Sequence, residues 1–263
     1  MRTNILSLFI GLASASLIFC AGCKKESTVA PSLSSYDNSS SGESIVTNEH
    51  IIIVRNPLGT VIMNGEGSAN PSVRWSVYKT VQAESRTQAS DLFASIALNI
   101  QTSNDTIYVT LNSSRHDNSS LQGSVQIGIP YNMICRIEQV AGNTYVSDLD
   151  TSLFVENASN VNVERHNGSC DISSGVGNVS VEFALPTNGL CRVNVAKGDI
   201  ALKTPTTTSA TVYAKSNNGT VSLTGFIITI TQQQSNFLTG TLGSGSGEIH
   251  AETNQGTIRL QSL

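Results

Sequence analysis

The sequence is poor in charge, because only 13% of its 263 residues are Asp, Glu, Lys or Arg, and the net charge of −4 is not gathered into runs. A nucleic-acid surface or a polybasic membrane patch needs clustered Lys or Arg, so the sequence predicts neither partner. Solvent-exposed helices braced by Glu–Lys pairs are also disfavoured. Ser, Thr, Asn and Gly are abundant instead, which favours turns and strands and predicts an all-β chain.

Motifs for catalysis are lacking as well. None of the four histidines forms an HxxxH or HxxE pair, no GxSxG elbow occurs, and the glycine-rich segment 243–247 has no phosphate-loop lysine. We therefore expect exposed or capping roles for the histidines and a flexible turn at 243–247. The sequence predicts no catalytic residue, no metal site and no cofactor. The histidines are His50, His116, His166 and His250.

The N-terminus has the order of an export signal: Arg2, an apolar run over residues 5–19, and small residues before Cys23. The run is shorter than the roughly 20 residues of a spanning helix. Residues 20–23 (CAGC) resemble a bacterial lipobox, which implies a signal peptide over 1–22 and a lipidated Cys23. The family prefers Leu where Cys20 stands. Ordinary secretion with a free Cys23, or an uncleaved anchor, are the alternatives.

Residues 23–44 are predicted to be the lipidated cysteine and a serine-rich tether, since the stretch has almost nothing apolar to bury. Fully extended, the tether could reach about 60 Å from a bilayer. Residues 24–26 (KKE) resemble the export signal of surface-displayed lipoproteins of Bacteroidota. The resemblance implies a cell-envelope location, with an outer-membrane lipoprotein as the expected form.

A glycine-centred repeat is the strongest feature of the remaining chain. The segment around Gly177 aligns without a gap with those around Gly198 and Gly219, at an offset of 21 residues. Relative to the glycine, positions −7, −5, +2 and +4 are apolar. The same frame fits Gly59, Gly142 and Gly256, and among the 24 positions only Thr144 is not apolar.

This alternation predicts two short strands with one buried face, joined by a glycine corner. A coil of 21 residues loses roughly 30 kcal/mol of conformational entropy on ordering and buries about four core side chains, so it cannot fold alone. Coils stacked about 4.8 Å apart would pair their backbones and stabilise one another. The sequence therefore predicts a β-solenoid or roll over residues 45–263, as one domain.

Two segments break the frame. Residues 72–120 read as an excursion near the N-terminal end of the stack, with strands at 72–81, 97–102 and 106–111, one short helix within 84–94, and a polar loop at 113–120. Residues 227–247 are expected to hold an irregular coil before the last regular one.

Four motifs resemble the bacterial putative-adhesin domains, a family of β-solenoid proteins: residues 59–63 (GTVIM), 86–92 (RTQASDL), 125–130 (VQIGIP) and 247–260 (GEIHAETNQGTIRL). They occur in the family's order and cover nearly all of 45–263. The resemblance implies the fold and leaves the ligand open. The departures are Cys at the −7 position of three coils and a glutamine-rich insertion at 231–235.

The cysteines at that −7 position, Cys135, Cys170 and Cys191, are expected to point inward as small apolar residues. A disulfide between Cys170 and Cys191 is the open alternative, because neighbouring coils would place their Cα atoms within bridging range, although parallel side chains in a ladder argue against it. A metal site is disfavoured by the absence of a CxxC motif or a partner histidine among them.

Contact surfaces are harder to assign. Exposed aromatics could bind carbohydrate or protein, and the candidates are Trp75, Tyr78 and Tyr108, which are expected to pack under the excursion. A solenoid enzyme would need converging carboxylates, and the candidates are Asp148, Asp150, Glu156 and Glu164.

The sequence favours a membrane-anchored lipoprotein with a non-catalytic β-solenoid for adhesion, binding or envelope scaffolding. Its expected partners are the membrane, through the lipid on Cys23, and an unidentified protein or glycan. A carbohydrate-active enzyme and a self-assembling structural protein are the alternatives.

Overall fold

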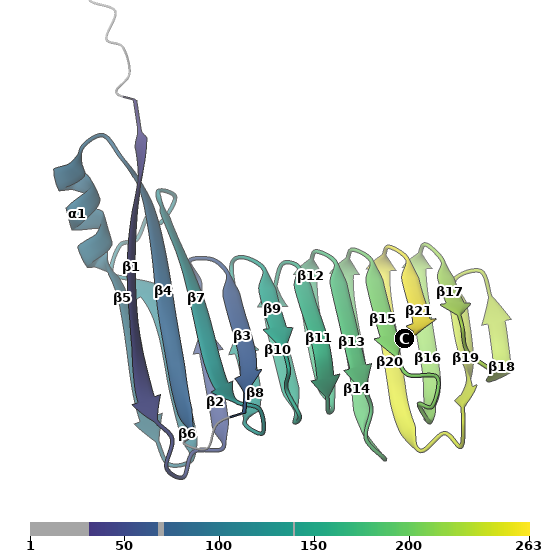
Figure 1. Ribbon diagram of the computed structural model, residues 1–263. Coiled ribbons are helices and arrows are strands. Elements are labelled where there is room, and N and C mark those ends of the chain that lie inside the picture. Colours follow the sequence, from purple (N-terminus) through teal and green to yellow (C-terminus); the bar gives the residue numbers. More distant parts are fainter. Residues whose placement is uncertain (1–31, 68–70, 139) are drawn as a thin grey trace, which may run out of the picture. The chain divides into compact units, whose positions relative to one another are not determined.

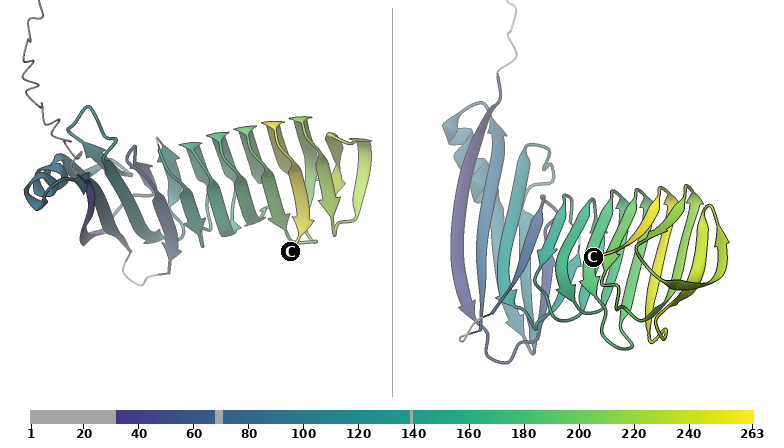
Figure 2. Two further views of the ribbon diagram at one scale, coloured as in Figure 1. Left: turned by 90° about the horizontal axis from the view of Figure 1, so that it is seen from above. Right: turned by 45° about the vertical axis from the view of Figure 1, so that its right-hand side comes forward.

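Two facing β-sheets make up the chain in a computed structural model, which describes residues 32–67, 71–138 and 140–263. Sheet A has ten strands and sheet B eleven, with the apolar core between them (Figure 1, Figure 2). In spatial order, sheet A consists of β1 (Ser34–Ile45), β4 (Ser72–Ala83), β7 (Leu121–Pro130), β3 (Val61–Glu66), β9 (Thr144–Ser147), β11 (Val161–Asn167), β13 (Val179–Ala184), β15 (Ile200–Thr204), β21 (Ile258–Ser262) and β17 (Val221–Thr224).

Sheet B runs alongside. In spatial order it consists of β5 (Ile96–Ser103), β6 (Thr106–Ser113), β2 (Ile51–Arg55), β8 (Ile134–Glu138), β10 (Leu153–Ala158), β12 (Cys170–Val176), β14 (Leu190–Lys197), β20 (Gly247–Gln255), β16 (Ala210–Asn218), β19 (Phe237–Leu242) and β18 (Ile228–Gln234). The single helix of the described residues, α1 (Arg86–Ser95), packs on β4. It is too short and too polar to cross a membrane.

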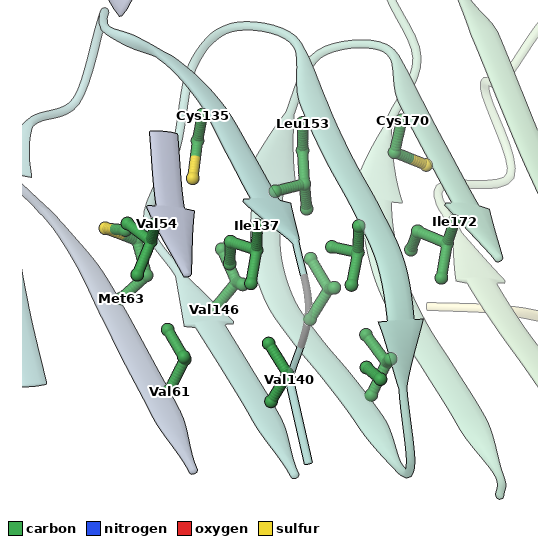
Figure 3. Close-up of a cluster of buried hydrophobic side chains, with 14 of the residues drawn as sticks. Val54, Val61, Met63, Cys135, Ile137, Val140, Val146, Leu153, Cys170 and Ile172 are labelled. Atoms are coloured by element: carbon green, nitrogen blue, oxygen red, sulfur yellow. The ribbon is translucent and has the colours of Figure 1, made fainter. Parts of the chain in front are cut away.

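Each regular coil gives one strand to each sheet, as the glycine frame predicts. Of the frame's 24 inward positions, all are buried except Val221 and Leu223, which are half-buried in β17 at the end of sheet A. Figure 3 shows inward side chains of four coils meeting between the sheets. The all-β solenoid architecture expected from the sequence is confirmed.

The glycine corners are fixed by close stacking. Gly177, Gly198 and Gly256 have φ between +147° and +149°, which L side chains rarely adopt. A Cβ atom on any of them would meet a carbonyl oxygen of the neighbouring coil. Glycine is therefore required at these corners by both backbone conformation and space.

A ladder of Asn and Asp side chains runs beside the glycine corners. Its members stand one residue after the corner of each coil. The Asn160 side-chain oxygen accepts the Asn178 N–H at 2.8 Å, and the Asn178 oxygen accepts the Asp199 N–H at 2.9 Å. Asp199 in turn accepts the Thr257 N–H at 2.7 Å. Each side chain thus satisfies a backbone donor of the next coil, which ties the coils together where the β-ladder is interrupted.

The order of stacking differs from the order of the chain. The last coil, β20–β21, lies between β14–β15 and β16–β17, and Figure 1 shows its yellow strands between green ones. Likewise β2–β3 lies between β6–β7 and β8–β9.

The prediction of an irregular coil over 227–247 is wrong. Strands β18 and β19 of this segment form an antiparallel hairpin that extends sheet B beyond β16.

Two further strand pairs correct the sequence interpretation. β10 and β11 form a regular coil that the frame missed, since Ser159 and Asn160 stand at its corner in place of glycine. The predicted tether over 23–44 is wrong for residues 34–44, which belong to the edge strand β1. All twelve residues of β1, from Ser34 to Ile45, pair with β4. This strand forms through backbone pairing, with Tyr36 as its contact to the core.

The N-terminal excursion is confirmed in its elements and corrected in its placement. Its strands β4, β5 and β6 and its helix α1 occur where the sequence predicts them. The strands, however, continue sheets A and B at their N-terminal ends. The region is therefore part of the same two-sheet stack.

Candidate binding surface

The outer face of sheet B carries a continuous row of large side chains. Each residue of this row is the register partner of the next one on the neighbouring strand, so the row runs straight across the strands of successive coils. We call this row the sheet-B row, and its members are Arg136, Phe154, Asp171, Arg192, His250 and Tyr213. The corresponding row on sheet A is mixed, since it includes Asn162, Ser180 and Ala201 as well as the larger Tyr145 and Arg259.

Aromatic contacts organise both ends of the row. Tyr213 and His250 stack with ring centroids 4.6 Å apart, and Phe237 meets the Tyr213 ring edge-on at 5.5 Å. At the other end, the Arg136 guanidinium lies 5.1 Å from the centre of the Phe154 ring. Stacked rings and cation–π pairs of this kind offer flat, amphipathic contact area.

Opposite charges are paired along the row. Arg192 contacts Asp171 at 3.1 Å, and Arg136 lies 3.7 Å from Glu156. His250 Nε2 also lies 3.4 Å from Glu252, and this contact is an ion pair only when the histidine is protonated. Solvent-exposed pairs contribute only about 0–1 kcal/mol each to stability, so the fold does not depend on them. The pairing leaves a polar surface with little net field.

A groove of about 300 Å³ adjoins the Tyr213 end of the row. Its lining includes the amides Asn194, Asn217 and Asn254, together with Lys215 and Glu252. The Asn217 amide donates to the Asn254 side-chain oxygen at 2.8 Å. Burial, followed by the nearby Glu252, raises the pKa of Tyr213, so its hydroxyl stays protonated and can donate at neutral pH.

Two of the four carboxylates considered for catalysis, Asp148 and Glu164, meet at the Arg165 guanidinium. Asp148 accepts two hydrogen bonds from Arg165, at 2.6 and 2.8 Å, and these hold its pKa below the usual value. Glu164 also contacts Arg165, while Asp150 accepts the Asn167 amide. These residues lie in or beside the strands of sheet A.

Glu156 lies in β10 of sheet B, on the other sheet from Glu164 of β11. The four carboxylates are therefore distributed over two sheets. This arrangement does not provide the facing acid and base that a glycoside hydrolase needs.

The candidate aromatics divide between core and surface. Trp75 is half-buried against the core cluster, where the sequence interpretation placed it. Tyr78 is 53% exposed, which corrects the expectation that it packs under the excursion. Tyr108 of β6 lies on the outer face of sheet B, in register with Ile53 of β2, whose other neighbour is Arg136.

The cysteines point inward, as predicted, and all three are buried and free. Burial raises the pKa of Cys135 to about 12, which makes it an unreactive thiol. Among the described residues, no cluster of three His, Cys, Asp or Glu side chains could hold a metal ion. Cys23 lies outside the described residues.

One histidine differs from expectation. His166 is 1% exposed, and its Nε2 lies 3.2 Å from the Ser169 carbonyl oxygen. Burial lowers its pKa below the usual 6.5, so it is uncharged at neutral pH. His50 and His116 are exposed, and His250 lies in the sheet-B row.

The sequence contained a signal for the sheet-B row that the interpretation did not use. Position −6 of the glycine frame holds Arg136, Asp171, Arg192, Tyr213 and His250. Five large polar or aromatic residues at one repeat position, on coils that stack in register, necessarily share one stripe of the surface.

Comparison with known proteins gives the same architecture. Residues 143–261 match the model of the Toastrack DUF4097 family. The Toastrack match covers five of the six coil strand pairs that carry the sheet-B row, and begins after β8. It confirms the resemblance to a putative-adhesin β-solenoid family.

Several solved structures are similar to the chain over most of its length. A putative cell adhesion protein from Clostridium sporogenes is 10% identical, with a TM-score of 0.47 over 86% of this chain and 100% of that one. A putative adhesin from Bacteroides fragilis is 12% identical, with a TM-score of 0.41 over 86% and 97%. A putative lipid binding protein from Parabacteroides distasonis is 10% identical, with a TM-score of 0.30 over 86% and 97%. No curated protein matches the chain.

Proposed function

We propose that this protein is an envelope lipoprotein whose β-solenoid is a non-catalytic binding module, and that the sheet-B row and the adjoining groove bind a glycan. The observation that carries the proposal is the in-register row from Arg136 to Tyr213. A row that crosses successive coils suits an extended polymer, because every coil along the stack contributes one side chain to it.

A glycan is favoured over a highly charged polymer by the chemistry of the surface. Arg192 is paired with Asp171 within the row, and Arg136 with Glu156 beside it, so these charges offset one another and do not favour a polyanion or polycation. The stacked Tyr213 and His250 rings offer a platform for a sugar ring, and the groove beside them offers amides and a hydroxyl for sugar hydroxyls.

The anchor in this proposal is the lipid on Cys23. The first residue of β1 is Ser34, so ten residues, 24–33, separate Cys23 from the sheet. Fully extended, that segment reaches at most about 36 Å, which is shorter than a tether ending at residue 44. A short tether would hold the stack close to the outer membrane.

The binding proposal is tested with the purified chain on a panel of soluble neutral and acidic polysaccharides. We expect binding to at least one polysaccharide, and a loss of about tenfold or more in Tyr213→Ala and Arg136→Ala. The matched control is Tyr145→Ala, which removes a tyrosine that is 42% exposed on the outer face of sheet A. Equal losses in all three variants, or binding to no member of the panel, would remove the support for this surface.

Three measurements test the remaining parts of the proposal. Chain length of the bound polysaccharide should stay constant during incubation, whereas turnover that a single Glu or Asp substitution abolishes would establish an enzyme. For the anchor, Cys23→Ala should release the protein from the membrane fraction, and unchanged membrane association would overturn lipid attachment. Protease accessibility of the chain on intact cells then tells surface display from an inward-facing location.

A further inference from the structure

Two cysteine sulfurs meet inside the stack. Cys170 of β12 and Cys191 of β14 are register partners on neighbouring parallel strands, and their Sγ atoms are 3.2 Å apart. The side chains are buried, with 2% and 0% exposure. Nothing in the binding surface explains why two thiols should share this position.

The third cysteine occupies the same interior row but has no sulfur neighbour. Register places Leu153 between Cys135 and Cys170, and Figure 3 shows the leucine side chain between the two sulfurs. Cys135 is thus as buried as the other two and differs from them in what lies beside it. It provides an internal control for any chemistry of the pair.

We propose that Cys170 and Cys191 are a disulfide site that clamps two adjacent coils when the chain folds in contact with a disulfide oxidant, and that Cys135 remains a thiol. The oxidant is a low-molecular-weight disulfide or an exported disulfide-donating protein. One thiolate attacks a sulfur of the oxidant and expels a thiol, and the second thiolate then attacks the mixed disulfide and expels the other thiol. Two protein thiols become one S–S bond, and the oxidant is reduced to two thiols.

The backbone already lies within range for this bond. Parallel neighbours in a sheet are about 4.8 Å apart, inside the roughly 4.4–6.8 Å range of Cα separations in disulfides. The sulfurs must approach by about 1 Å to reach the bond length of about 2.05 Å. The approach requires rotation about the Cα–Cβ bonds, because register partners on parallel strands point their side chains in the same direction.

Burial determines when the bond can form. In the closed stack the sulfurs are out of reach of an oxidant, and burial raises the pKa of Cys191, which keeps its thiolate scarce. Exchange must therefore take place before the coil of β14 and β15 closes on the coil of β12 and β13, or during an opening of that contact. Once formed, the bond is shielded from reduction by the same burial.

Peptide mapping of the full-length chain tests the proposal directly. The chain is folded in glutathione buffers of increasing oxidised fraction, denatured, alkylated with iodoacetamide and digested with trypsin. Cleavage after Arg165 and Arg192 yields one peptide that contains both cysteines, and cleavage after Arg115 and Arg136 yields the peptide of Cys135. We expect the first peptide to be unalkylated and about 2 Da lighter than its reduced form, and the second to carry an alkyl group.

A second digestion makes the linkage explicit. Cleavage before Asp171 separates the two cysteines, so the fragments should stay joined until a reductant is added. Two alkyl groups on the 166–192 peptide at the most oxidising ratio would overturn the proposal. Glutathione attached to Cys170 or Cys191 in place of their mutual bond would also overturn it.

Stability provides an independent measurement. The thermal midpoint of the oxidised chain should exceed that of the reduced chain by about 5–10 °C. Cys191→Ser should abolish this dependence on redox state, and Cys135→Ser should preserve it. A redox dependence that persists in Cys191→Ser would assign the effect to another cysteine and contradict the proposal.

Discussion

A Cβ atom at Gly198 would collide with the carbonyl oxygen of Gly177 on the preceding coil. Gly198 also has φ of +148°, a conformation nearly reserved for glycine. We therefore predict that Gly198→Ala lowers the free energy of unfolding by more than about 3 kcal/mol, from backbone strain and the displaced coil together. Urea denaturation measures the change.

The matched control for this prediction is Gly175→Ala. Gly175 belongs to β12, close to the corner, but its φ is not positive and no atom lies within 4 Å of the added methyl group. Its free energy of unfolding should stay within about 0.5 kcal/mol of the parent. Similar losses in both variants would show that general strand effects, and not the corner, set the requirement for glycine.

Side-chain direction was the part of the fold that the sequence could predict. A strand exposes alternate residues to alternate faces, so apolar residues at −7, −5, +2 and +4 had to point inward wherever the glycine corner recurs. The prediction failed where the local signal was absent. Ser159 and Asn160 replace glycine at the corner of β10–β11, and β1 buries little, so its pairing with β4 leaves no apolar pattern.

The order of the coils could not be read from the sequence, because their inward residues are nearly interchangeable. The coil of β20 and β21 presents Ile249, Ala251, Ile258 and Leu260 to its neighbours, and the coil of β14 and β15 presents the similar set Cys191, Val193, Ile200 and Leu202. The sheet-B row was missed for a related reason: it becomes a surface only once the coils are aligned in register.

Thr144 offers a test of the polar exception in the repeat. It is fully buried in β9 between Val61 of β3 and Val161 of β11, and its hydroxyl has no hydrogen-bond partner among the described residues. Thr144→Val keeps the shape and removes the unpaired hydroxyl, so it should raise the free energy of unfolding by about 1–2 kcal/mol. The shift is measured by urea denaturation.

For a buried threonine whose hydroxyl has a hydrogen-bond partner, we expect the opposite change in the free energy of unfolding. Thr208 and Thr204 share a hydrogen bond of 2.7 Å between their hydroxyls. Thr208→Val leaves the Thr204 hydroxyl unpaired and should lower the free energy of unfolding by about 1 kcal/mol. A destabilised Thr144→Val would indicate that its hydroxyl is satisfied in solution.

Deleting residues 247–263 tests the stacking order. This segment supplies β20 and β21, and β21 is the strand that pairs with β17 in sheet A. Hydrogen exchange at residues 221–224 should accelerate by about tenfold or more, while β12 and β13, farther along the stack, keep their protection. In a stack ordered like the sequence, the deletion would remove a terminal coil, so retained protection of residues 221–224 would contradict the insertion.

His166 predicts a component of acid sensitivity. Burial lowers its pKa in the folded chain, so the unfolded chain, with a pKa near 6.5, binds the proton more tightly. The contribution of His166 to the free energy of unfolding is therefore complete above about pH 6.5. It falls as the pH drops toward the pKa of the folded chain, with a slope of at most about 1.4 kcal/mol per pH unit.

The variant His166→Gln removes the titration and keeps an amide that can donate to the Ser169 carbonyl. Its free energy of unfolding should therefore vary less between pH 7 and pH 5, as measured by urea denaturation at each pH. The exposed His116 gives the control, since His116→Gln should follow the parent profile. Parallel pH profiles for His166→Gln and the parent would mean that the pKa of His166 is the same in the folded and the unfolded chain, and would contradict the prediction.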